Sequence, residues 1–154
     1  MDSGNSAALA MLEGARAARS RPVESEAAVL AAVALAPSDL DVRIGAYKFY
    51  FYNCRLAEAL PHAEAVLRIA ARRLNIATDW RAVSASDADF SSLDKPPRLY
   101  MQSLVALAYC HARVGAIDEA LAGLAKAAEL DRLDRFGAGR LVEVVRRGAF
   151  AEQD

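Results

Sequence analysis

Residues 107–131 read LAYCHARVGAIDEALAGLAKAAELD, and this stretch decides the fold. Apolar and small residues recur through it at the three- and four-residue intervals that place side chains on one face of an α-helix. Gly115 interrupts the pattern and is suited to close a helix, because glycine readily adopts the positive φ found at many helix C-termini. The stretch therefore predicts two helices joined by a tight turn, with Ala120 and Ala127 as the small residues where the helices touch.

Two earlier segments align with this one. The first runs from Ser20 to about Pro37, where the helical pattern ends, and the second starts at Cys54. Ser20 and Cys54 are 34 residues apart, which is the period of the tetratricopeptide repeat. The chain resembles the tetratricopeptide family most clearly in its third unit, where the family's signature positions hold Leu107, Ala108, Gly115, Ala120, Leu124 and Ala127.

The resemblance implies an all-α fold, a right-handed solenoid of three helix pairs followed by a C-terminal capping helix, in a single domain spanning residues 1–154. We expect repeats at about 6–39, 40–76 and 98–134, an insertion at 77–97 and the capping helix at 137–148. Within the repeats, helices are expected at about 6–19, 23–36, 40–53, 57–76, 98–114 and 117–131. His111 stands where the family usually has tyrosine, and Arg132 replaces its closing proline. An unrelated helical bundle is the alternative.

The insertion at 77–97 is not required by the repeat. A segment of this length without structure of its own is usually functional or disordered. It contains Trp80 and Phe90, and such residues are scarce in disordered chains. We therefore expect the insertion to pack on the helices, with Trp80 and Phe90 as its anchors.

Composition and charge exclude several classes of protein. Alanine accounts for 35 of the 154 residues, so helices are strongly favoured and can approach closely. The formal charge of −1 leaves no basic excess for a phosphate backbone, so nucleic acid is not an expected partner. The first residues lack the features of a secretory signal, and no apolar run is long enough to span a membrane. Two cysteines in helical patterns indicate reduced thiols, so we expect a cytoplasmic protein, and the Arg-rich, Lys-poor composition suggests a bacterial one.

The family resemblance also places a binding groove. In that family the first helix of each pair lines the concave face, which implies two sets of partner-binding residues here: Ile44, Lys48, Phe51 and Tyr52, and Gln102, Val105, Tyr109 and Arg113. The run Tyr47-Lys48-Phe49-Tyr50-Phe51-Tyr52 puts aromatic rings on nearly every side of a helix, whereas an amphipathic helix needs one apolar stripe. Some rings are therefore expected in the groove. The alternative is that all five fill the core or lie under the insertion.

The sequence contains no recognisable catalytic or metal-binding pattern. Cys54 with His62, and Cys110 with His111, do not have the spacing of a common zinc site. The run from Asp87 to Asp89 lacks the glycine and glutamate of a calcium loop. No phosphate-binding loop or nucleophile elbow is present. We therefore expect no enzyme activity, no cofactor and no metal.

These inferences favour a protein–protein interaction module, an adaptor or chaperone-like protein that binds a peptide or helix of another protein in an aromatic groove. The alternative is a structural subunit that assembles with copies of itself, using the aromatic surface as a homodimer interface. A third hypothesis, a regulator that binds a small molecule or metal, has less support in the sequence.

Overall fold

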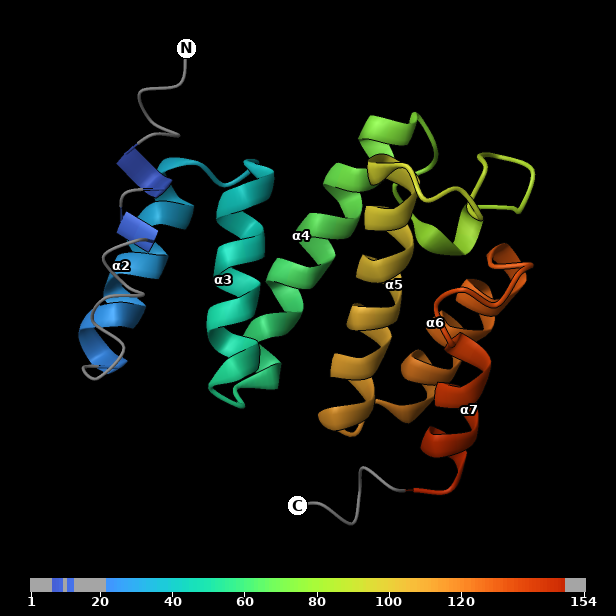
Figure 1. The fold of residues 1–154 in the computed structure, drawn as a ribbon. Helices are drawn as coiled ribbons and strands as arrows, with labels where there is room; N and C mark the ends of the chain where they lie inside the picture. Colours follow the sequence, from blue (N-terminus) through green and yellow to red (C-terminus); the bar gives the residue numbers. More distant parts are fainter. Residues whose placement is uncertain (1–6, 10, 13–21, 149–154) are drawn as a thin grey trace. The chain divides into compact units, whose positions relative to one another are not determined.

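The computed structural model describes residues 7–9, 11–12 and 22–148, and every regular element among them is helical (Figure 1). The predicted all-α fold class is therefore confirmed. In chain order the elements are α2 (Pro22–Leu35), α3 (Leu40–Tyr52), α4 (Leu56–Leu74), the 3-10 helix η1 (Trp80–Ala82), α5 (Lys95–Arg113), α6 (Ile117–Leu130) and α7 (Ala138–Arg146).

These limits lie close to those expected from the sequence. The helix expected at 6–19 falls largely outside the described residues, although residues 7–9 and 11–12 are helical. The main difference is at α5, which begins at Lys95 and not at residue 98. Pro96 and Pro97 occupy its first turn, where a missing backbone N–H costs nothing and the fixed φ of proline suits a helix. The insertion is correspondingly shorter at its C-terminal end.

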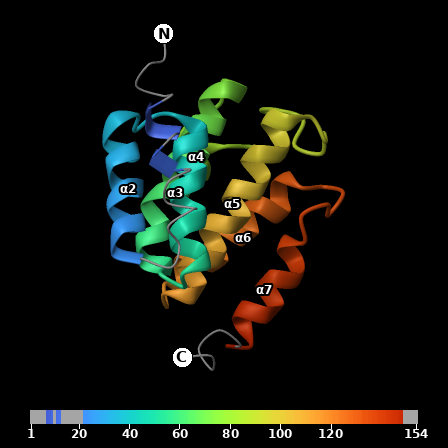
Figure 2. The same cartoon turned by 60° about the vertical axis from the view of Figure 1, so that its left-hand side comes forward.

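Internal packing divides the chain into two compact units, Met1–Val66 and Leu67–Asp154, with the boundary inside α4. In unit 1, α2 packs against α3, and a short turn connects α3 to α4 (Figure 2). The Asp39 carboxylate caps α3 by accepting a hydrogen bond from the Val42 N–H at 3.0 Å. Small side chains such as Ala46 and Ala59 are fully buried and let the backbones approach.

In unit 2, α6 packs against both α5 and α7. Ala120 and Ala127 are fully buried on α6, as the sequence predicted for the residues where the helices touch. Helices α5 and α6 approach closely at Gly123, where an added Cβ would lie 3.2 Å from the Cβ of Ala108. The small residues of the decisive stretch thus set the spacing between these two helices.

The same turn ends α3 in unit 1 and α5 in unit 2. After α5, Gly115 has a φ of 89° and the Ala116 N–H donates to the His111 carbonyl at 2.8 Å. After α3, Cys54 has a φ of 58° and the Arg55 N–H donates to the Tyr50 carbonyl at 2.8 Å. Both turns are Schellman motifs, which satisfy carbonyl groups left unpaired at the helix end. The positive φ predicted for Gly115 is confirmed.

Candidate protein-binding surfaces

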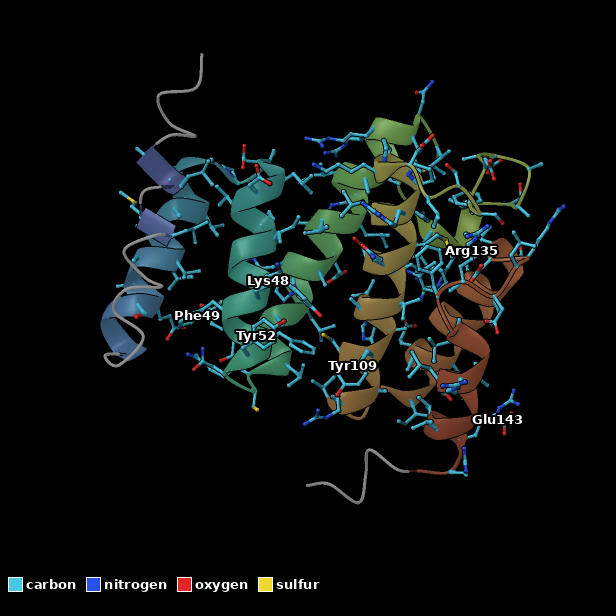
Figure 3. The ribbon with its side chains drawn as sticks, in the orientation of Figure 1. Lys48, Phe49, Tyr52, Tyr109, Arg135 and Glu143 are labelled. Atoms are coloured by element: carbon cyan, nitrogen blue, oxygen red, sulfur yellow. The ribbon has the colours of Figure 1, made fainter. Side chains whose placement is uncertain are left out.

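Two of the four predicted groove residues of unit 1 project into solvent from α3. Lys48 is exposed, and Tyr52 keeps 76% of its surface accessible, more than any other large apolar side chain described as exposed. Lys48 and Tyr52 are four residues apart, so they lie on the same face of α3 (Figure 3). Ile44 and Phe51 are half-buried, and the Phe51 ring meets Tyr52 edge-on with centroids 5.5 Å apart.

The five aromatic rings of α3 divide between core and surface. Tyr50 belongs to the core, with 2% of its surface exposed, and its ring stacks on His62 at 5.6 Å. Tyr47, Phe49 and Phe51 are half-buried, and Figure 3 shows Phe49 on the side of α3 nearest α2. The alternative in which all five rings fill the core is therefore wrong, because Tyr52 lies outside it.

The predicted groove residues of unit 2 lie along the surface of α5. Gln102 is exposed, whereas Val105, Tyr109 and Arg113 are half-buried. The Arg113 guanidinium donates to the Tyr109 hydroxyl at 2.8 Å and lies 5.7 Å from the centre of that ring. Each side chain therefore restrains the other, and a phenol and a cation are held together on the surface.

The two surfaces correspond position by position. Cys54 and Gly115 occupy the same place in their turns and are 61 positions apart. The same offset relates Lys48 to Tyr109 and Tyr52 to Arg113. Each unit therefore presents one cation and one phenol at the same two helix positions, in opposite order. The sequence signal for this correspondence is the alignment of the two turns, which brings these positions into register.

The insertion packs within unit 2 through Trp80 and Phe90. These side chains keep 9% and 2% of their surfaces exposed, and the Phe90 ring lies 5.7 Å from that of Tyr100 on α5. Lys126 on α6 donates to the Val83 carbonyl at 2.7 Å. Arg81 stacks on Trp80 at 4.2 Å and forms an ion pair with Glu119 on α6. Gln102 on the exposed side of α5 is left accessible.

In the part of the chain that the structure describes, no group of three His, Cys, Asp or Glu side chains is placed to hold a metal ion. Cys54 is exposed and Cys110 is buried, and no disulfide joins them. None of the described helices combines the length and apolar character needed to cross a membrane.

No family model matches the chain, and no solved structure does. Over 123 residues it is 33% identical to the "Uncharacterized 19.8 kDa protein in nifW 5'region" of Azotobacter chroococcum mcd 1, a match that covers 79% of this chain and 69% of that protein. The chain belongs to this family. The name of the Azotobacter protein gives the location of its gene and states no activity.

Sequence reasoning missed a polar cluster in unit 1. Arg55 bonds Glu26 at 2.8 Å and also pairs with Glu58, and the Tyr50 hydroxyl donates to Glu26 at 2.9 Å. The Arg55 and Tyr50 hydrogen bonds hold the pKa of Glu26 below its ordinary value. Burial, with the Glu26 bond, raises the pKa of Tyr50 to about 12.

His62 is four residues from Glu58, a spacing that favours pairing on an exposed helix face. In the structure Glu58 pairs with Arg55 instead, and His62 is buried. The His62 Nδ1 lies 2.9 Å from the Arg43 guanidinium, which can only donate, so this nitrogen is the acceptor. Burial, reinforced by the Arg43 charge, lowers the pKa of His62 to about 4. The Arg43–His62, Tyr50–Glu26 and Arg55–Glu26 contacts join residues 19 to 29 positions apart, so no local pattern reveals them.

Proposed function

We propose that the chain is a protein-binding module of tetratricopeptide-like helix pairs, an adaptor or chaperone-like protein that acts by binding a peptide or helix rather than by catalysis. The repeated turn at Cys54 and Gly115 supports the relation between the pairs. So do Ala59 and Ala120, which follow these turns at the same distance and are both fully buried. That Cys54 and Cys110 are not joined in a disulfide supports a cytoplasmic location.

The observation that carries the proposal is the exposed Tyr52 beside Lys48, together with Tyr109 and Arg113 at the equivalent positions. Tyrosine and arginine dominate the energetics of protein interfaces, since each combines a large contact area with hydrogen-bonding groups. An exposed tyrosine also gains more from burial against a partner than one already in the core. We infer that these two surfaces contact the partner.

Site-specific photo-crosslinking in the native organism tests the proposal. A benzophenone side chain at position 52 or 109 is expected to capture the same partner protein, whereas one at exposed Ala125 on α6 is not. Tyr52→Ala and Arg113→Ala are expected to weaken binding of the captured partner by about tenfold or more, as truncation of an interface anchor does.

The controls are Leu30→Ala in unit 1 and Leu133→Ala in unit 2, which remove apolar side chains that are 50% and 62% exposed elsewhere. Both controls should bind the partner normally. Equal weakening in the controls, or loss of the helical circular dichroism signal in the Tyr52 and Arg113 variants, would contradict the assignment.

Self-assembly is a second candidate, favoured by the surface of α2. Over residues 25–35, where the burial of its side chains is described, the exposed positions are all apolar, namely Ala27, Leu30, Ala31, Ala34 and Leu35. An exposed apolar stripe on a helix is a frequent site of association. Light scattering at two protein concentrations separates the candidates, because a mass that stays monomeric at both removes the homodimer.

A further inference from the structure

The accessible side of α5 is a single stripe that extends beyond the predicted groove residues. Its members are spaced at three and four residues and are exposed or half-buried. Most other residues of α5 are buried, although Pro96 is exposed and Leu99, Ala106 and His111 are half-buried. From one end to the other, the α5 stripe consists of Lys95, Arg98, Gln102, Val105, Tyr109 and Arg113.

The charge of the α5 stripe has one sign. No Asp or Glu occurs anywhere in α5, while α6 carries Asp118, Glu119 and Glu129 against one lysine. Cations stand at both ends of the stripe, and a half-buried Val105 and Tyr109 lie between them. The stripe is therefore a cationic surface with an apolar centre.

Folding does not account for the cations at the start of α5. Lys95 and Arg98 lie in the first turn, where the helix dipole disfavours positive charge. Asp94, at the N-cap, makes no side-chain hydrogen bond to the helix. Among the described residues neither Lys95 nor Arg98 forms an ion pair, in contrast to Arg55, Arg81 and Lys126.

The same end of unit 2 carries further positive charge. Arg72 and Arg73 are exposed in the last turn of α4, and Figures 1 and 2 both place the end of α4 near the start of α5. At a helix C-terminus arginines are favoured by the dipole. Combined with Lys95 and Arg98, they make this end of the stripe the more strongly cationic one.

We propose that the α5 stripe binds an acidic segment of a partner protein, with carboxylates at both of its ends and an apolar side chain over Val105 and Tyr109. This inference rests on the proposed function and specifies the chemistry of the partner. A protein segment is favoured over nucleic acid because the centre of the stripe is apolar and the chain as a whole has a net charge of −1.

The geometry of the helix sets the spacing of the carboxylates. Arg98 and Arg113 are fifteen residues apart, which corresponds to about 22 Å along a helix axis. An extended peptide advances about 3.3 Å per residue, so its acidic groups should be about seven residues apart. The more acidic end should lie against Lys95 and Arg98.

The test uses the full chain and fluorescein-labelled peptides about nine residues long, the length that spans the stripe. The first peptide has two glutamates at each end and leucines in the middle. The second has the same composition with its four glutamates adjacent, and the third has lysines in place of glutamates. A single-stranded oligonucleotide of the same length is the fourth probe. Anisotropy is measured at about 20 mM and about 300 mM salt, where screening differs strongly.

We expect the acid-ended peptide to bind most tightly and to weaken at high salt. Arg98→Gln/Arg113→Gln should weaken it by about tenfold, the loss expected for two surface ion pairs. The control Arg132→Gln/Arg140→Gln changes the net charge equally at exposed positions outside the stripe and should have little effect. The Arg98→Gln variant alone, measured beside the double variant with circular dichroism, guards against a folding defect at Arg113.

Equal weakening in the control pair, equal binding of the clustered-glutamate peptide, no binding at low salt, or tighter binding of the oligonucleotide would each overturn the inference. Its failure is distinguishable from failure of the proposed function. If position 109 crosslinks to a partner segment without acidic residues, the proposed function stands and the acidic preference falls.

Discussion

At the scale of single residues, Cys54 and Gly115 occupy one backbone position with very different side chains. Cys54 has a φ of 58° in a region that glycine adopts freely, and other residues adopt it at a cost of about 1 kcal/mol or more. The turn therefore forms at Cys54 because hydrogen bonds and packing on both sides enforce it.

We predict that Cys54→Gly stabilises the protein by about 0.5 to 1 kcal/mol, since relief of strain exceeds the added freedom of the unfolded chain. Gly115→Ala should destabilise it by about 1 kcal/mol or more. No atom lies within 4 Å of a Cβ added at Gly115, so this cost is conformational and not steric. Urea denaturation measures both changes, and a loss of stability in Cys54→Gly would contradict the prediction.

His62 makes stability depend on pH. The unfolded ring takes up a proton near its ordinary pKa of 6.5, whereas the folded ring resists protonation to about pH 4. The contribution of His62 is therefore complete above pH 6.5 and is lost progressively as pH falls toward 4. The integrated loss is up to about 3 kcal/mol.

We predict that the free energy of unfolding falls between pH 6.5 and 4.5 and that His62→Gln flattens this dependence. His111→Gln is the control, because it removes the other histidine of the chain. Glu26 has a pKa below its ordinary value of 4.5. Its contribution to stability is therefore lost only below about pH 4.5, outside this window. An unchanged slope in His62→Gln would exclude His62 as its source.

At the scale of elements, the insertion between α4 and α5 is held by contacts that span large sequence distances. Trp80 and Phe90 are buried, and Arg81 and Lys126 connect the insertion to α6 by polar contacts. Arg81 and Glu119 are exposed, so their ion pair contributes little compared with burial of the rings.

We predict that Trp80→Ala destabilises the protein by about 3 kcal/mol, as truncation of a buried aromatic side chain does. Leu93→Ala, in the same insertion but 59% exposed, should change stability by less than about 0.5 kcal/mol. Circular dichroism in urea measures both. Limited proteolysis between Thr78 and Lys95 should be slow in the wild type and fast only in Trp80→Ala, and rapid wild-type cleavage would argue against a packed insertion.

At the scale of the whole molecule, α4 belongs to both compact units. It runs without interruption from Leu56 to Leu74 across the boundary between Val66 and Leu67. Its backbone hydrogen bonds follow one another along the whole helix. Breaking the helix at the boundary would forfeit these bonds.

We predict that tryptophan fluorescence and circular dichroism give the same urea midpoint. Trp80 is the one tryptophan and reports on unit 2, whereas the dichroism reports on all the helices. Ala65→Pro should separate the two transitions, because an interior proline costs a helix about 3 kcal/mol. Glu64→Ala, an exposed change in the same helix, should not. Separate urea midpoints for fluorescence and circular dichroism in the wild type would contradict the prediction.

Much of the helical layout follows from local information. The limits of α2, α3, α6 and α7 lie within about two residues of those expected, because periodicity, Pro37 and Gly115 act over a few residues. The start of α5 differs from the expected one because Pro96 and Pro97 suit a helix start as well as a loop. The candidate site could be predicted in part, since helix spacing alone places Tyr52 and Lys48 on one face of a helix.

By itself, the sequence determined the helices, the turn at Gly115 and the small residues at the α5–α6 contact, because each depends on the conformational preferences of neighbouring residues. Only the tertiary structure decided which α3 rings are buried, since Tyr50 and Tyr52 have the same side chain and differ only in their surroundings. It also brought Glu26 to Arg55 and Arg43 to His62. Such pairs depend on how helices pack, and packing joins residues whose separation along the chain leaves no local trace.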